Sequence, residues 1–298
     1  MLTNSQTHNQ SILRPLLTFA LLLMAAPFCL VSAQGLNWEG QTGAFITPFA
    51  YTSQSPAKGI GKPQFAFHFM NVGDVIGNNI QASVTVGVGG RAEFGYTRSF
   101  NAAGKIAGLS PLFEGGFNTF HAKLNLVPEN AAKTKYLPGI SAGFVVRSQV
   151  KHVGGVLTNK ETTNGDFYVV GTKTITQVKG LPFLINVGVK GTNASVFGIA
   201  GNATKWEARA FGAIAFVFKG PAKSTLIVGS EAAQQPRYIK DLPGATVPTT
   251  MTYFVRIVPV PEKPFNVDFG IAQAAGKIAP GVDLKARSQF AMGVSYRF

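Results

Sequence analysis

The charged side chains of this chain are few, and many of them recur at alternate positions of otherwise apolar segments. That spacing places them on one face of a β-strand, because successive strand side chains point to opposite sides. The sequence has 27 Lys and Arg against 13 Asp and Glu, so bases should dominate this face. Basic groups along a watery passage favour anions. We therefore expect a lumen lined by Arg91, Lys123, Arg147, Lys190, Lys205, Arg209, Arg256 and Arg297.

Acidic residues are expected on the same polar face. Glu93, Glu207 and Asp268 fall there by alternation, and Glu231 is a further candidate. Lys or Arg on a lipid-facing surface costs about 2–4 kcal/mol near the bilayer midplane, so the charges must point inward if the segments cross a membrane. Inward charges are compatible with two interiors. Either they line a narrow water path, or they fill a closed, salt-bridged barrel.

Other chemistry finds little support in the sequence. The histidines that follow the first 33 residues are His68, His121 and His152, and none forms a short-spaced metal pair. No G-x-S-x-G elbow marks a nucleophilic serine. The glycines at 87, 89 and 90 precede another alternating segment rather than a helix, so they indicate a hairpin turn instead of a dinucleotide loop. We predict no enzyme activity, no metal, no cofactor and no nucleic-acid partner.

The elements that position these residues are amphipathic strands. Apolar and polar residues alternate in twelve segments, and the connections between them are alternately long and tight, with 128–138 the exception. Even strand numbers and this asymmetry are typical of transmembrane barrels, whereas a soluble β-sandwich gives no reason for it. The predicted fold is all-β, a single antiparallel up-and-down transmembrane β-barrel of about twelve strands, or fourteen if residues 34–63 add two. The predicted strands are 64–71, 80–88, 91–100, 119–126, 140–149, 166–178, 183–190, 205–218, 224–235, 252–257, 265–271 and 287–298.

The last of these segments ends the chain with Tyr296 and Phe298 on its apolar face. An amphipathic strand with a terminal Phe resembles the carboxyl-terminal signal that the assembly machinery of bacterial outer-membrane barrels reads. Closure of an edgeless sheet requires this strand to pair with the first one, near Gln64. Further aromatic residues near predicted strand ends should form girdles at the membrane interfaces, namely Tyr96, Phe100, Tyr168, Trp206 and Tyr253.

The amino-terminal 33 residues predict export. One base, an apolar run from Leu16 to Leu30 and the small residues that end at Ala33 are typical of a cleaved signal peptide. Cys29, the single cysteine, lies within it, so the mature chain has no disulfide. We expect three parts: a signal peptide (1–33), a periplasmic lead-in or plug (34–63) and an outer-membrane barrel (64–298).

The lead-in contains the stretch TGAFITPFAYT, from Thr42 to Thr52. It resembles the TG-x-x-x-TP-x-A stretch that opens several outer-membrane barrel families, among them the YjbH-like proteins linked to exopolysaccharide export. The resemblance covers mainly the first sixty mature residues. It implies an outer-membrane barrel and, as a possible partner, an exopolysaccharide.

Two functions follow from these expectations. The first is a porin-like channel in the outer membrane that passes small anionic solutes or acidic glycan through a basic lumen. The second is a non-conducting structural or interaction barrel that binds partners through outer loops such as 101–115 and 236–250. Outer-membrane lipid and the barrel-assembly machinery are expected partners of both.

Overall fold

The computed structural model describes residues 35–102, 104–106, 110–150, 162–178, 180–237, 239, 241–259, 265–279, 282–283 and 288–298. The predicted signal peptide lies outside these ranges. Among the described residues, no helix is long and apolar enough to cross a membrane.

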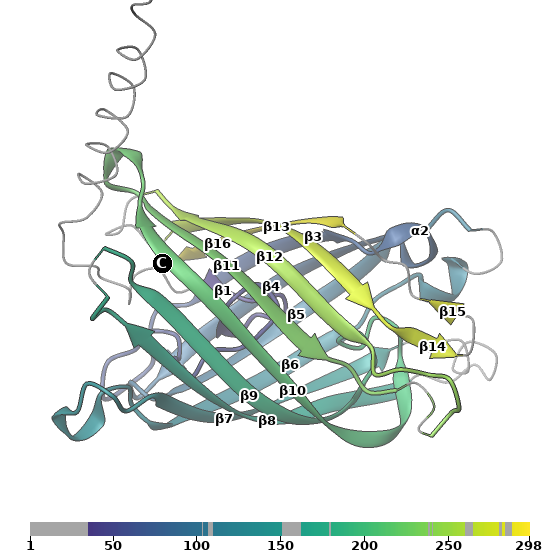
Figure 1. Ribbon diagram of the computed structural model, residues 1–298, viewed down its shortest axis with the longest axis horizontal. Helices are drawn as coiled ribbons and strands as arrows, with labels where there is room; N and C mark the ends of the chain where they lie inside the picture. Colours follow the sequence, from purple (N-terminus) through teal and green to yellow (C-terminus); the bar gives the residue numbers. More distant parts are fainter. Residues whose placement is uncertain are drawn as a thin grey trace, which may run out of the picture.

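Twelve antiparallel strands close into one barrel (Figure 1), and this confirms the predicted fold. Each strand pairs with its neighbours in the sequence, and the last pairs with the first, with Tyr296 opposite Phe65. No strand of the wall is left with an open edge, so its backbone groups bond within the sheet. The wall consists of β3 (Gln64–Asn71), β4 (Asn78–Val88), β5 (Ala92–Ala102), β6 (Asn118–Val127), β7 (Gly139–Val150), β8 (Thr162–Ile175), β9 (Phe183–Ala194), β10 (Asn202–Lys219), β11 (Thr225–Gln234), β12 (Thr249–Val258), β13 (Phe265–Ala275) and β16 (Gln289–Arg297).

The two ends of the barrel differ. One end, here called the turn end, carries the connections 89–91, 128–138 and 220–224, together with the carboxyl terminus. The other, here called the loop end, carries the short helices α2 (Gly73–Ile76) and η2 (Ser110–Phe113) and a small hairpin of β14 (Lys277–Ala279) and β15 (Val282–Asp283). The short helices η3 (Ala131–Lys133) and η4 (Pro221–Lys223) belong to the turn end.

The outer face of the wall is apolar. The pleat turns every second side chain outward, and these residues are mostly Phe, Val, Leu and Ile. Phe167 and Val187 are 63% and 62% exposed although they lie within strands. A continuous apolar band around a closed barrel is the surface that lipid hydrocarbon covers in transmembrane barrels.

Residues 35–53, here called the plug, lie inside the barrel. The plug begins with a two-residue hairpin of β1 (Gly35–Leu36) and β2 (Thr42–Gly43). Leu36, Trp38 and Phe45 have no exposed surface. β1 and β2 form a two-stranded sheet that is separate from the barrel, so the wall has twelve strands and not fourteen.

The chain leaves the plug at the turn end, where residues 54–63 run along the β4–β5 turn. Gly61 donates its amide to the carbonyl of Gly87 at 2.8 Å, and Gly89 donates to Gly59 at 2.9 Å. The segment predicted as lead-in or plug therefore has two parts, one inside the barrel and one along its rim.

The inner face of the wall is polar in one half and apolar in the other. The pairing of β10 with β9 runs unbroken from Glu207 to Phe216, and its irregularity lies between Asn202 and Glu207. The side chains of Phe211 and Ala213 consequently face the interior, where the aromatic residues of the plug cover them. Tyr168, expected in an outer girdle, is also buried in this core.

Candidate functional site

The contacts between the plug and the wall centre on the loop from Thr42 to Thr47. Glu231 of β11 accepts hydrogen bonds from the amides of Phe45, Ile46 and Thr47, at 2.7–2.8 Å, and from the Thr47 hydroxyl at 2.7 Å. Successive amides that converge on one anion form a nest. Because no cation in the described residues pairs with Glu231, the plug itself supplies the donors that stabilise this buried carboxylate.

A second carboxylate holds Thr42 close to Ser53, the last residue of the plug. Glu93 of β5 accepts from the amide and hydroxyl of Thr42, at 3.0 and 2.6 Å, and from the Ser53 amide at 2.7 Å. Lys123 of β6 pairs with Glu93 at 2.8 Å and donates to the Thr42 carbonyl at 2.9 Å. Since both charged groups are fully buried, each depends on the other and on the plug.

A third contact binds the carbonyls of the same loop. Arg256 of β12 pairs with Asp268 of β13 through two parallel hydrogen bonds of 2.7 and 2.9 Å. Its remaining donors reach the carbonyls of Gly43 and Ala44 at 2.9 and 3.2 Å. A guanidinium suits this position because its fixed fork can bind a carboxylate and a carbonyl pair simultaneously.

A fourth contact links the plug to β7 and β8. Arg147 pairs with Glu39 of the plug at 2.5 Å and with Asp166 at 2.8 Å. Lys190 of β9 lies 3.8 Å from the same Asp166 and 4.9 Å above the ring of Phe197. These buried charges neutralise one another in a cluster between plug and wall.

The loop between β9 and β10 covers the plug from the loop end. Val196, Phe197 and Ile199 are buried, and Phe197 belongs to the same core as Trp38 and Phe45 of the plug. Gly198 permits the fold of this loop, because its φ of +84° suits glycine and a Cβ would lie 2.7 Å from Arg147. The interior is thus filled from both ends.

The eight predicted lumen bases occupy different places. Lys123, Arg147, Lys190 and Arg256 are buried inside the barrel. Arg209 pairs with Glu207 at the loop end, and Arg297 is half-buried at the turn end. Arg91 and Lys205 are exposed, so neither is among the buried bases inside the barrel. Arg91 belongs to the β4–β5 turn, and Lys205 lies in the irregular part of β10, and strand alternation fails at both places.

The predicted acids lie inside, but the sequence did not reveal what they bind. Glu93, Glu207 and Asp268 are buried. Glu93 pairs with Lys123 rather than with Arg91, its neighbour in sequence. Glu39 and Asp166 were not predicted at all. Alternation along β8 could have identified Asp166, since it shares a face with buried Tyr168 and Val170.

The charges of the wall balance without the plug. In the described middle of the lumen, the bases Lys123, Arg147, Lys190 and Arg256 face four wall carboxylates, which are Glu93, Asp166, Glu231 and Asp268. The basic excess of the sequence therefore resides elsewhere. Much of it lies at the turn end, where Lys58, Lys62, Lys133, Lys135 and Lys223 are exposed.

The apolar contacts of the plug are as extensive as the polar ones. Five large apolar side chains of the plug are buried against the apolar half of the wall: Leu36, Trp38, Phe45, Ile46 and Phe49. Burial of each such side chain contributes about 2 kcal/mol, so together they contribute about 10 kcal/mol. These apolar contacts therefore oppose departure of the plug from the lumen.

Comparison with known proteins supplies a family and a set of similar folds. The family model described as "Protein of unknown function (DUF3034)" matches residues 34–279. No curated protein matches the sequence, so the resemblance to YjbH-like proteins stays a prediction.

Similar solved structures include three barrels. The KdgM porin has 7% identity and a TM-score of 0.45, over 80% of this chain and 99% of that one. The NanC porin has 9% identity and a TM-score of 0.46, over 79% and 100%. An outer membrane channel from Pseudomonas putida F1 has 7% identity and a TM-score of 0.45, over 85% and 100%. These likenesses concern the barrel alone.

Proposed function

The chain belongs to the DUF3034 family, and we propose that it is a bacterial outer-membrane β-barrel that its own plug keeps closed. The observation that carries this proposal is the binding of the loop from Thr42 to Thr47 by three sets of wall side chains, centred on Glu93, Glu231 and Arg256. These contacts use peptide groups and hydroxyls of the plug, and they hold the loop to three different parts of the wall.

The location in a membrane is supported by the surface of the barrel. Hydrocarbon tolerates a sheet only when every backbone group is bonded internally, which the closed wall achieves. The side chains that point outward form an apolar band, which hydrocarbon can cover. The predicted signal peptide and the amphipathic last strand agree with export to the outer membrane.

The closed state favours a non-conducting barrel over an open porin. Free diffusion needs a continuous water path, and the plug, together with the loop that contains Phe197, fills the lumen. The buried bases Lys123, Arg147 and Arg256 are already paired with carboxylates, so they do not offer free positive charge to anions. Any binding of partners would then occur at the two ends of the barrel, including the outer loops.

Passage of small anionic solutes or acidic glycan is the second candidate, and it requires the plug to leave. The wall would then present balanced charges, so its bases alone would not select anions. What favours this candidate is the basic turn end, whose exposed lysines would raise the local concentration of anions at the entrance.

A disulfide that fixes the plug distinguishes the two functions. A Cβ at Gly139 of β7 would lie 3.5 Å from the Cβ of Ala50, which suits a disulfide. We therefore design Ala50→Cys with Gly139→Cys in a Cys29→Ser background. The wild-type protein should show no steady conductance in planar bilayers, and a variant with weakened plug contacts, Glu93→Gln with Glu231→Gln, should show opening events.

The oxidised disulfide should abolish these events when added to the weakened variant, and a reductant should restore them. Steady wild-type conductance that persists with the disulfide formed would refute the closed barrel. Openings that the disulfide does not affect would show that ions take a path other than the one the plug blocks.

A further inference from the structure

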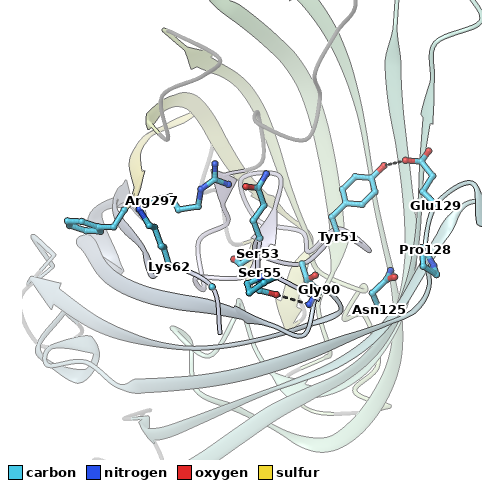
Figure 2. A pocket seen from close by; sticks show the side chains of 14 residues that line it. Tyr51, Ser53, Ser55, Lys62, Gly90, Asn125, Pro128, Glu129 and Arg297 are labelled. Atoms are coloured by element: carbon cyan, nitrogen blue, oxygen red, sulfur yellow. Dashed lines mark hydrogen bonds between the residues drawn. The ribbon is translucent and has the colours of Figure 1, made fainter. Parts of the chain in front are cut away.

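We propose that a pocket at the turn end is a binding site for a small organic anion that carries hydroxyl groups. The pocket has a volume of about 560 Å³ and lies between the end of the plug and the rim of the wall (Figure 2). Binding pockets for small molecules typically measure 300–1,000 Å³, so this volume admits a molecule of monosaccharide or disaccharide size. The proposal goes beyond the closed barrel, because the pocket is accessible from the turn end while the plug stays in place.

The cationic side of the pocket is formed by Lys62 and Arg297, which Figure 2 shows next to each other. Neither forms an ion pair with a described residue, in contrast to the bases inside the barrel. An ammonium and a guanidinium that lack partners and face one cavity are suited to a carboxylate or phosphate group. The anionic group of the ligand should therefore occupy this side.

On the opposite side of the pocket, hydrogen bonds hold Tyr51 in place, and the negative charge of Glu129 is neutralised by a lysine. Tyr51 donates to Glu129 at 2.7 Å and also contacts the hydroxyl of Thr174 at 2.9 Å. Burial raises the pKa of Tyr51, so its hydroxyl remains a proton donor. Glu129 also pairs with Lys173 at 3.0 Å, outside the pocket lining, so its charge does not offset the two free cations.

The remaining lining is polar and small. Thr52 and Ser55 contribute hydroxyls, and the Ser55 oxygen already accepts the Gly90 amide at 2.8 Å, which leaves its proton for a ligand. Such groups suit the hydroxyls of a polyol, whereas a bare inorganic ion would leave most of the volume unused. Charge on one side and hydroxyls along the wall together specify a hydroxylated organic acid.

The charged residues around the pocket also favour an anionic ligand. Around the turn end, Lys58, Arg91, Lys133, Lys135 and Lys223 are exposed, whereas the acidic groups among the described residues of this end are the side chain of Glu129 and the terminal carboxylate at Phe298. A cluster of like charges around a concave site attracts ligands of opposite charge and raises their rate of association.

The test compares gluconate with sorbitol, its neutral counterpart, by calorimetric titration of the full barrel in detergent micelles. Gluconate should bind at least tenfold more tightly than sorbitol. Lys62→Gln should weaken gluconate binding about tenfold, whereas Lys58→Gln, which removes an equal charge from the same rim outside the pocket, should leave it unchanged. Both side chains are exposed, so neither variant should impair folding.

The oxidised Ala50→Cys, Gly139→Cys protein should bind gluconate as well as the wild type does, because the pocket does not require an open lumen. Loss of binding upon oxidation would show that the anion binds only when the plug can move, and would overturn the proposal. Equal binding of gluconate and sorbitol, equal weakening by the two lysine variants, or no binding at all would also overturn it. None of these outcomes depends on whether the barrel conducts.

Discussion

The carboxylate of Glu231 offers the most direct way to loosen the plug. Its Oε1 accepts the amides of Phe45 and Ile46, and its Oε2 accepts the amide and hydroxyl of Thr47. In Glu231→Gln one of these positions becomes an amide nitrogen, which can only donate. Two hydrogen bonds to a charged acceptor are therefore replaced by contacts between donors.

The magnitude follows from these two hydrogen bonds. Each bond to a charged group contributes about 1.5–3 kcal/mol, and the loss of both would cost about 3–6 kcal/mol. Removal of a buried charge offsets part of this cost. We expect a net loss of about 3 kcal/mol in plug binding, which raises the fraction of molecules with a released plug about 100-fold.

A buried thiol measures that fraction. Ala50 is fully buried and faces Gly139, which leaves room for the sulfur of Ala50→Cys. In a Cys29→Ser background, the rate of maleimide modification should rise about 100-fold when Glu231→Gln is added. Asp74→Asn is the matched control, because its ion pair with Lys105 is exposed and should contribute little. A change below threefold for Glu231→Gln would refute the idea that this carboxylate anchors the plug.

Three further outcomes test the plug and the wall. Gly43→Ala places a Cβ 2.3 Å from a plug carbonyl and should speed thiol modification at least tenfold, whereas Gly191→Ala, with nothing within 4 Å, should not. Lys123→Met leaves a buried carboxylate without its cation and should destabilise the barrel by about 3–5 kcal/mol in urea unfolding. Val187→Arg should lower stability in lipid by about 2–4 kcal/mol, whereas Ile60→Arg at the rim should have little effect, and equal effects would contradict a lipid-facing Val187.

The wall could be predicted from the sequence because strand periodicity is a local property. Alternation gave the twelve strands, and backbone closure required the last strand to pair near Gln64, as it does. Alternation carries less information where local regularity ends. Arg91 lies in a turn and Lys205 in an irregular stretch, and both are exposed, unlike the bases that regular strands bury inside the barrel.

The interior could not be predicted in the same way, because the type of residue that can face inward depends on what packs against it. Alternation cannot show that Phe211 faces inward, since an inward apolar residue is expected only when another apolar surface covers it. That surface belongs to the plug, some 170 positions earlier in the chain. The partners of Glu93 and Glu231 are likewise distant in sequence, so a basic lumen was the natural expectation from composition.

The stretch from Thr42 to Thr52 gains a physical explanation in this chain. Thr42 and Thr47 donate their hydroxyls to Glu93 and Glu231, and Gly43 approaches a neighbouring carbonyl too closely for any side chain. The structure thus explains three residues of the TG-x-x-x-TP pattern, Thr42, Gly43 and Thr47, by the shape and contacts of the loop that binds the wall. A similar stretch in another barrel would require only a similar way of closing the lumen, and no common cargo. For this reason the contacts around Glu231, rather than the resemblance itself, are the place to test what the protein does.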